Sequence, residues 1–275
     1  MPVTCDQPKT RGRAGQLERY LTKNVLGADF ICPHHHECRA SHTGRFYEGQ
    51  LHHVGRFYDL QLDAKPVRVV VVGQEYGQAP PRVSCHARHD MLMSSALDHR
   101  FKAGDGFKAR NPHMRGTTNV LRLLYGIPLG TDHDSEFMMI GGERVHIFNA
   151  FALVNYLLCS AVPAAGSKRG KATPTMKRNC QSHFREVMRI LDPTVVVVQG
   201  KGFWSSVGAA FDAVSQQTDH VYRARLGSAE MSVAVFTHPS AQYPDNWGAN
   251  DHTPYLIETV KPSIARIRRQ WRRTL

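Results

Sequence analysis

Three short polar clusters follow apolar segments of the chain, and each carries side chains that can do chemistry. The first, GQEYG at residues 73–77, supplies an amide, a carboxylate and a phenol. The second, FNAF at 148–151, supplies an amide, and the third, FTHPS at 236–240, supplies an imidazole and a hydroxyl. A carboxylate can orient water, an imidazole can donate a hydrogen bond, and an amide can donate and accept at once. Each cluster is therefore a candidate part of an active site.

The apolar segments before these clusters predict the strands that position them. Residues 67–73 (VRVVVVG) contain five valines in seven positions, which is typical of a central parallel strand covered on both faces. Further buried strands are predicted at 144–150, 194–199 and 231–237, and helices at 16–26, 117–124, 179–191, 201–211 and 254–275. This alternation predicts an α/β sandwich with a mainly parallel sheet. Ligands of such sheets bind beyond the carboxyl ends of the strands, where Gln74, Glu75 and Tyr76 are expected.

The remaining segments predict one domain. Residues 1–15 are basic and contain Pro and Gly, so we expect a flexible N-terminus followed by a single domain at 16–275. Alternating aromatic and polar residues over 44–63 predict paired short strands. Residues 78–114 lack lasting periodicity and predict a long functional loop that contains a short helix.

Charge and composition narrow the class of protein. Lys and Arg number 35 against 23 Asp and Glu, and the net charge of +12 favours a polyanionic partner, with nucleic acid first and a solvated basic surface as the alternative. A hydrophobic fraction of 41% excludes a disordered chain. No apolar run is long enough to span a bilayer and the N-terminus lacks a secretory signal, so we expect a soluble cytoplasmic protein without a membrane partner. Six cysteines in a reducing compartment then favour metal ligands or buried thiols over disulfides.

The three clusters, in this order, resemble the motifs of the uracil-DNA glycosylase superfamily. GQEYG is similar to motif A and is intermediate between the GQDPY of family 1 and the GEAPG type of family 4. FNAF resembles the strand whose asparagine contacts uracil, and HPS resembles motif B. PHMRGTTNVL at 112–121 is similar to the family 4 segment PFVGRAGQLL. The resemblance runs from about residue 30 to the last helix and implies a three-layer α/β/α sandwich around a central, mainly parallel four-stranded sheet.

This resemblance implies an activity. Members hydrolyse the N-glycosidic bond of uracil in DNA and leave an abasic site for base excision repair, so we expect a monofunctional hydrolase acting on uracil or other deaminated bases. His238 would donate to uracil O2, and Asn149 would hydrogen-bond the uracil edge. Glu75 occupies the place of the family 1 aspartate, and Gln74 occupies that of the family 4 glutamate. Both residues are therefore candidates for the catalytic group of motif A. A non-catalytic DNA-binding relative and a hydrolase of free nucleosides or nucleotides are the alternatives.

Further residues match the substrate-binding and DNA-binding places of the superfamily. Gly73 and Tyr76 of motif A, Ser240 of HPS, and His113 at the place of the family 4 stacking phenylalanine are expected around the base. Weak stacking by an imidazole would favour single-stranded or mismatched uracil sites. The expected DNA contacts are Lys168, Arg169 and Lys171 in the loop between Cys159 and Cys180, and Tyr243 or Trp247 as an intercalating side chain. We expect a monomer.

Four cysteines match the family 4 ligands of a four-iron four-sulfur (4Fe-4S) cluster in their order. These are Cys32, Cys38, Cys159 and Cys180. Their spacing departs from the family, because five residues separate the first two. Thiolate ligation suits an iron–sulfur cluster. A zinc site that includes the His34–His36 run, or thiols without a ligand, are the alternatives.

Overall fold

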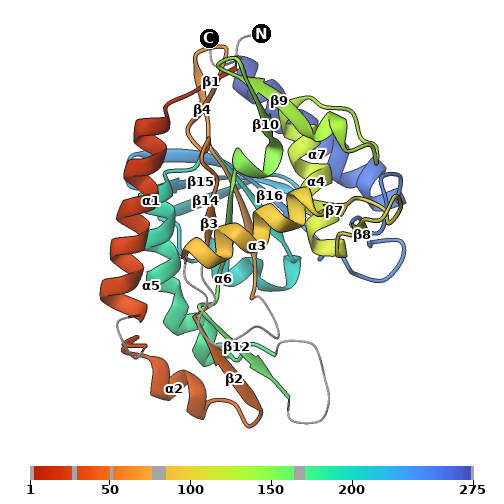
Figure 1. The fold of residues 1–275 in the computed structure, drawn as a ribbon. Coiled ribbons are helices and arrows are strands. Elements are labelled where there is room, and N and C mark those ends of the chain that lie inside the picture. The colour runs from red at the N-terminus through yellow and green to blue at the C-terminus, as the bar shows by residue number, and fades with distance from the viewer. Residues whose placement is uncertain (1–2, 27–29, 50–51, 76–84, 164–170, 274–275) are drawn as a thin grey trace.

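A seven-stranded sheet with helices on both faces forms the centre of the molecule (Figure 1). The computed structural model describes residues 3–26, 30–49, 52–75, 85–163 and 171–273, without the side chains of 85–87 and 272–273. The strand order is β14-β15-β16-β13-β6-β11-β3. The sheet strands are β3 (His53–Val54), β6 (Val69–Gly73), β11 (Ala152–Asn155), β13 (Val195–Gln199), β14 (Ala213–Thr218), β15 (Val221–Leu226) and β16 (Ala229–Phe236).

Four of these strands are parallel and form the middle of the sheet. β6 pairs with β11 on one side and β13 on the other, and β13 pairs with β16. The predicted parallel centre is therefore confirmed, but the expected number of four strands is wrong for the whole sheet. β15 and β14 extend one edge and β3 extends the other, all antiparallel to their neighbours. The turns between β14, β15 and β16 are short, and short turns join only antiparallel strands.

Each face of the sheet buries a separate hydrophobic cluster, because alternate side chains of a strand point to opposite faces. Val70 and Val72 belong to the cluster beneath α1 (Gln7–Leu21), α5 (Pro174–Leu191) and α6 (Trp204–Gly208). Val69 and Val71 belong to the cluster beneath α3 (Cys85–Leu97), α4 (Pro112–Tyr125) and α7 (Lys261–Arg273). The predicted helices at 117–124 and 179–191 thus lie within α4 and α5.

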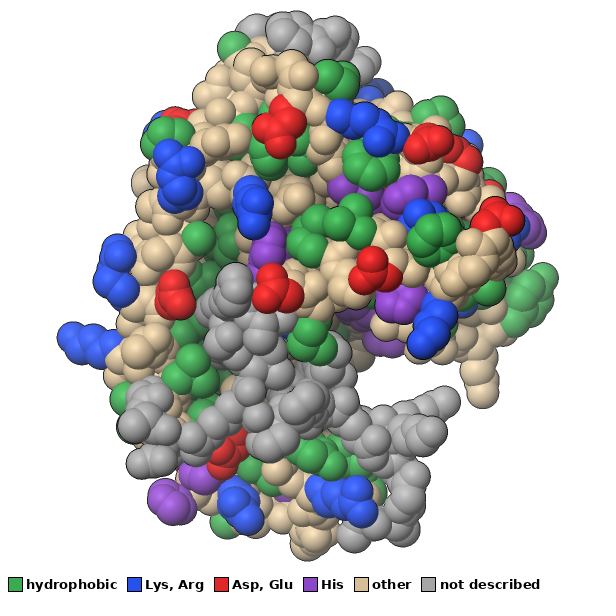
Figure 2. All heavy atoms as spheres, in the orientation of Figure 1, with side chains coloured by type: hydrophobic (Ala, Val, Ile, Leu, Met, Phe, Trp, Pro, Cys, Tyr) green, Lys and Arg blue, Asp and Glu red, His purple; other side chains and the backbone are tan. Residues whose placement is uncertain are grey.

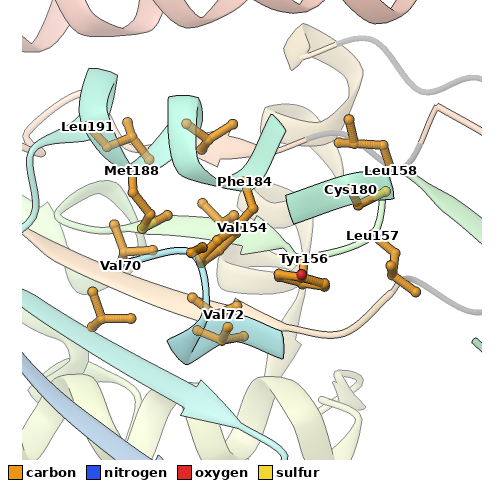
Figure 3. Close-up of a cluster of buried hydrophobic side chains, with 14 of the residues drawn as sticks. Val70, Val72, Val154, Tyr156, Leu157, Leu158, Cys180, Phe184, Met188 and Leu191 are labelled. Carbon is orange, nitrogen blue, oxygen red and sulfur yellow. The ribbon is translucent and has the colours of Figure 1, made fainter. Parts of the chain in front are cut away.

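Charged side chains of both signs are mixed on the face that Figure 2 shows, which carries α1 and α3. A net charge of +12 therefore does not gather into one basic patch on that face. Figure 3 shows the interior beneath α5, where Val70, Val72 and Val154 of the sheet lie near Phe184 and Met188 of the helix.

The N-terminus is anchored instead of flexible over the part that the structure describes. β1 (Val3–Cys5) pairs with β4 (Leu60–Leu62), and α1 begins at Gln7 after Asp6, which accepts from the Lys9 amide. Arg13 donates to Asp59 at 3.0 Å and to the Ile190 carbonyl at 2.8 Å. The structure shows no boundary at residue 15, because β1 pairs with β4, α1 continues through this position, and Arg13 contacts distant parts of the chain.

The second predicted strand, at 144–150, is also corrected. β10 (Glu143–His146) pairs with β9 (Phe137–Ile140) in a hairpin outside the main sheet, and a 3-10 turn follows at Ile147–Asn149. The sheet strand is β11, which begins at Ala152. Both segments are short and apolar, so their periodicity alone cannot tell which one pairs with β6.

The strands predicted over 44–63 form, but they do not pair with one another. β2 (Arg45–Glu48) pairs with β12 (Cys159–Val162), β3 pairs with β11, and β4 pairs with β1 and β5 (Lys65–Val67). The remaining elements are α2 (His35–Ala40), β7 (His99–Arg100), β8 (Lys108–Ala109), 3-10 turns at Asp134–Glu136 and Lys201–Phe203, and π-helical turns at Thr22–Leu26 and Leu256–Val260. Within the described ranges, no helix is both long and apolar enough to cross a membrane.

Buried neutral histidines make the fold sensitive to acid. Burial, together with the charge of the nearby His89, lowers the pKa of His53 to about 3. A histidine of the unfolded chain titrates near its usual 6.5, so between about pH 6.5 and 3 the unfolded chain binds the extra proton. His53 therefore contributes stability that is present above about pH 6.5 and is lost as the pH falls, at up to about 1.4 kcal/mol per pH unit.

We expect His53→Gln to reduce the dependence of the free energy of unfolding on pH between about pH 6.5 and 5, measured by urea denaturation. The glutamine amide can still donate to the Phe148 carbonyl, which the His53 Nε2 atom contacts at 2.9 Å. His252→Gln is the matched control, because the His252 side chain is exposed and its substitution should leave the dependence unchanged. An unchanged slope in the His53 variant would contradict this assignment.

Candidate active site

Polar residues lie at, or just after, the carboxyl ends of all four parallel strands. These strand ends form one edge of the sheet, which runs across the strands. Gln74 and Glu75 follow β6, Asn155 ends β11 and Gln199 ends β13. His238 comes two residues after the end of β16. Parallel strands bring their carboxyl ends to a shared edge, so the prediction that motif A and His238 lie at one edge is confirmed.

Asn155, and not Asn149, is the asparagine at this edge. Asn155 is the direct partner of Gly73 in the sheet and is 4% exposed. Asn149 lies in the turn before β11, at the amino end of that strand, where its carbonyl accepts from the Phe57 amide at 2.8 Å. The prediction for Asn149 is therefore wrong. The sequence contained one signal for Asn155, because Asn155 is much closer than Asn149 to Cys159, and the family 4 cysteine directly follows the asparagine strand.

Gly73 has no side chain, so the side chains of His113 and Asn155 can approach its backbone closely. A Cβ atom on Gly73 would lie 3.2 Å from His113 Nε2 and 3.7 Å from Asn155 Oδ1. His113 belongs to the first turn of α4, so that helix places an imidazole directly against motif A. Gly73 and His113, which were both expected around the base, are therefore neighbours.

The two imidazoles of the site face each other and differ in environment. Their ring centroids are 5.9 Å apart. Burial, together with the charges of His238 and Arg88, lowers the pKa of His113 to about 3, so His113 is neutral near pH 7. Arg88 is a buried residue of α3 that sequence reasoning missed, and its positive charge disfavours protonation of His113.

Hydrogen bonds fix the tautomer of His238 when its ring is neutral. The Ser240 backbone amide donates to His238 Nδ1 at 3.2 Å, and Ser240 Oγ lies 2.8 Å from the same atom. A backbone amide can only donate, so Nδ1 is unprotonated and the ring hydrogen lies on Nε2. His238 is exposed, and Ser240 orients its ring.

Trp247 anchors the loop that carries His238. Its ring is fully buried, and Nε1 donates to the Thr237 carbonyl at 2.8 Å. A Cβ atom on Gly116 of α4 would lie 2.8 Å from the Pro239 side chain and 3.0 Å from the Trp247 ring, so the helix and the loop pack closely. The prediction of Trp247 as an intercalating residue is therefore wrong. Tyr243 is 75% exposed and stays available for that role.

The Glu75 carboxylate is held by two donors. Ser160 Oγ donates to Oε2 at 2.6 Å and the Gln74 amide donates to Oε1 at 3.0 Å. Burial raises the pKa of Glu75 above its usual value, while these two hydrogen bonds act in the opposite direction. Sequence reasoning missed Ser160, which belongs to β12 beside Cys159.

The four candidate cysteines belong to, or pack against, one buried hydrophobic cluster. Cys38, Cys159 and Cys180 are buried within it, and Cys32 packs against it. Cys32 Sγ lies 3.7 Å from His183 Nε2, and the Asn179 amide donates to Cys38 Sγ at 3.6 Å. Burial raises the pKa of all four thiols, that of Cys180 to about 12. None of the described cysteines is in a disulfide.

A second group of possible metal ligands has a structural role. His133, Glu136 and His146 offer ligand atoms within 4.8 Å of one another. Arg110 Nη2 lies 2.6 Å from Glu136 Oε2, and both side chains are fully buried. This carboxylate is already neutralised by a guanidinium, so an added cation would be repelled.

Of the predicted DNA contacts in the loop before α5, the structure describes only Lys171. Lys171 is exposed, and its amide donates to the carbonyl of Ala161 at 2.7 Å, in the strand whose Ser160 donates to Glu75. Tyr76, Lys168 and Arg169 lie outside the residues that the structure describes.

Comparison with known proteins assigns no family, because no protein-family model matches the chain and no curated protein matches it. The chemistry of the site therefore has to be inferred from its own groups. They are a buried amide at Asn155, an N–H donor at His238, a held carboxylate at Glu75 and a neutral imidazole at His113. Such a site can bind a planar polar ring by its edge and stabilise negative charge that develops on it.

We expect Trp247→Ala to lower the free energy of unfolding by about 3–5 kcal/mol, because it removes a fully buried ring and leaves a cavity. Tyr243→Ala is the control and should change it by no more than about 0.5 kcal/mol, because that side chain is exposed. Urea denaturation of both variants tests the assignment. Equal losses of stability would show that Trp247 does not anchor the loop.

Proposed function

We propose that this chain is a DNA glycosylase that hydrolyses the N-glycosidic bond of uracil in DNA and leaves an abasic site. The observation that carries the proposal is the pairing of Asn155 with Gly73 at the sheet edge, within reach of His113 and beside the loop of His238. On this proposal the mixed α/β fold is a uracil-DNA glycosylase-like sandwich, extended at both sheet edges.

Asn155 would select the base. Its side-chain N–H can donate to uracil O4 while its Oδ1 accepts from N3–H. The corresponding edge of cytosine has a donor and an acceptor in exchanged places, so it would leave both groups of Asn155 unpaired. Unpaired buried polar groups produce stronger discrimination than shape alone.

His238 would stabilise the leaving group. Breaking the bond to deoxyribose leaves the electron pair on the base, and negative charge develops at uracil O2. The Nε2–H of neutral His238 can donate to that oxygen, and a donor of this kind typically contributes about 3–4 kcal/mol to the transition state. His113 would lie against the base at the place where a stacking ring is needed.

Glu75 would act on the sugar side of the reaction. A carboxylate can orient the attacking water and stabilise positive charge on the deoxyribose ring. Ser160 and Gln74 both donate to this carboxylate and hold it in one position. A second candidate function is a DNA-binding protein without catalysis. The same two hydrogen bonds favour it, because they occupy lone pairs of the Glu75 carboxylate that would otherwise accept from the attacking water.

DNA contacts would come from the loop after His238 and from the basic surface. Tyr243 is exposed by 75% and lies five residues after His238, so it can occupy the space of an extruded nucleotide. Lys171, with Lys168 and Arg169 in the same loop, would contact phosphates and make binding dependent on salt.

The four cysteines fit a 4Fe-4S cluster, which we propose as the cofactor. The fit rests on the donor set: four thiols, from α2 with its preceding loop, β12 and α5, belong to or pack against one buried cluster, without a disulfide among them. A bound cluster would supply a covalent link between these segments. Because Ser160 follows Cys159 directly, such a link would also fix the donor that holds Glu75.

We expect Asn155→Ala and His238→Ala to reduce uracil release from a single-stranded uracil oligonucleotide by at least about 100-fold in single-turnover assays. Asn149→Ala is the matched control and should retain activity within about twofold, because Asn149 lies at the other end of β11.

Absence of release from uracil, hypoxanthine and xanthine substrates at enzyme excess would overturn the enzymatic proposal. Salt-dependent DNA binding without release would then support the non-catalytic alternative. Loss of activity in the Asn149 variant with full activity in the Asn155 variant would reverse the assignment of the base-binding residue.

For the cofactor, we expect protein purified without oxygen to be brown and to contain iron and sulfide in equal amounts. Cys159→Ser should remove most of the iron, while Cys5→Ser should retain it, because Cys5 lies on β1 beside Thr10 and away from the cluster. Chemical analysis of iron, sulfide and zinc distinguishes the outcomes. Colourless protein with zinc or without metal would contradict the proposal.

A further inference from the structure

Arg115 is a half-buried cation that has no partner among the described residues. It ends the first turn of α4, and its Nε atom is buried without a hydrogen bond. Other arginines that are buried or half-buried contact a carboxylate, and these are Arg13, Arg68, Arg110 and Arg122. A guanidinium that loses water without gaining such a contact lowers the stability of the fold. Locally unfavourable groups of this kind are typical of places that bind a ligand.

The charge of Arg115 is open to an anion from outside the protein. Burial is the sole cause of the lowered pKa of this guanidinium, so no carboxylate of the described residues neutralises it. Neither Nη atom is among the buried atoms that lack a partner, so the Nη end of the side chain reaches the surface. An arginine stays protonated at neutral pH, and its paired N–H groups match the oxygens of a phosphate.

The first turn of α4 places His113 and Arg115 on different sides of the helix. A Cβ atom on Gly73 would lie 3.2 Å from His113 Nε2. Thr117, one turn after His113, accepts from the Gln199 side chain at 3.1 Å, so this side of α4 faces the sheet. Residues two apart on a helix point about 200° away from each other. Arg115 therefore lies on the outer side of the same turn that brings His113 to the candidate active site.

The loop after β16 lies along the same part of α4. Asn119, one turn after Arg115, donates to the Trp247 and Asn250 carbonyls, both at 3.2 Å. Asn119 and Arg115 share one side of the helix, so Arg115 lies toward the active-site end of this contact. The same loop carries Tyr243, which is 75% exposed. An unpaired cation and an exposed aromatic ring on neighbouring segments suit a single strand of nucleic acid, which offers both phosphates and bases.

We propose that Arg115 binds a phosphate of the DNA strand whose nucleotide enters the candidate active site. The proposal rests on the DNA-binding part of the proposed function and not on base removal. The base and the phosphate of a nucleotide are attached to different ends of the sugar, which matches the places of His113 and Arg115 on two sides of one helical turn. The phosphate supplies the anionic partner that the described part of the fold does not provide.

The test is binding of a single-stranded oligonucleotide without uracil to the full chain, measured by fluorescence anisotropy between about 50 and 200 mM salt. Arg115→Gln should weaken binding at least about fivefold at the lowest salt concentration. It should also reduce the slope of log K against log salt concentration by about 0.7, the value of one phosphate contact to a single strand. Arg115→Lys should keep the slope, because it keeps the charge.

Arg11→Gln is the matched control. Arg11 is an exposed arginine of α1, which lies on the opposite face of the sheet from α4 (Figure 1). Its substitution removes the same charge from the chain and should leave both the affinity and the slope unchanged. Arg115→Gln should not lower the midpoint of urea denaturation, because it removes a desolvated charge that has no ion pair among the described residues.

Three results would overturn the proposal. The first is an affinity and a slope that Arg115→Gln leaves unchanged. The second is weaker binding with an unchanged slope and a lower denaturation midpoint, which would make Arg115 a structural residue. The third is the absence of DNA binding by the unchanged chain. Uracil release is measured separately, so a chain that binds DNA through Arg115 but releases no base would contradict the glycosylase proposal and support this one.

Discussion

The parallel pairing of β6 with β11 and β13 is the constraint on which the rest of this structure depends. It brings the carboxyl ends of the strands to one edge and sets Gly73 opposite Asn155. Val70 and Val72 belong to one hydrophobic cluster and Val69 and Val71 to the other, so both faces of β6 are held by apolar packing. A shift of one residue would leave valine on both faces, but it would put a residue with a side chain in the place of Gly73, where a Cβ atom would lie 3.2 Å from His113 Nε2. The register of β6 therefore depends on Gly73 as well as on the valines.

Close approach at that edge depends on glycine. Gly73 leaves room for His113 and Asn155, and Gly116 allows α4 to pack against the loop that carries His238. The support of this loop is buried even though His238 itself is exposed, because Trp247 and Thr237 are hydrogen-bonded beneath it. An exposed functional group on a rigid support is the arrangement that lowers the cost of ordering when a ligand binds.

The net charge of +12 overstates the positive charge that the surface can offer to a polyanion. Arg110 is fully buried against Glu136, and Arg13 lies between Asp59 and the Ile190 carbonyl. These cations stabilise the interior and connect distant segments, so they are not available to a polyanion. The basic character that favours nucleic acid therefore rests on the exposed part of the arginines and lysines, which Figure 2 shows mixed with acidic residues.

The sequence by itself determined the valine strands β6, β13 and β16, the end of α5 at Leu191, and the presence of a site at the ends of those strands. These features follow from local periodicity, which a chain carries in its own order of residues. Only the tertiary structure decided that ALVN at 152–155, and not the apolar run before it, pairs with β6, and hence that Asn155 replaces Asn149. It also decided that the basic N-terminus is anchored, because Arg13 meets Asp59 and Asp192 from 46 and 179 residues away. Strand partners and ion pairs at such separations depend on packing of the whole chain, and no short window of sequence contains that information.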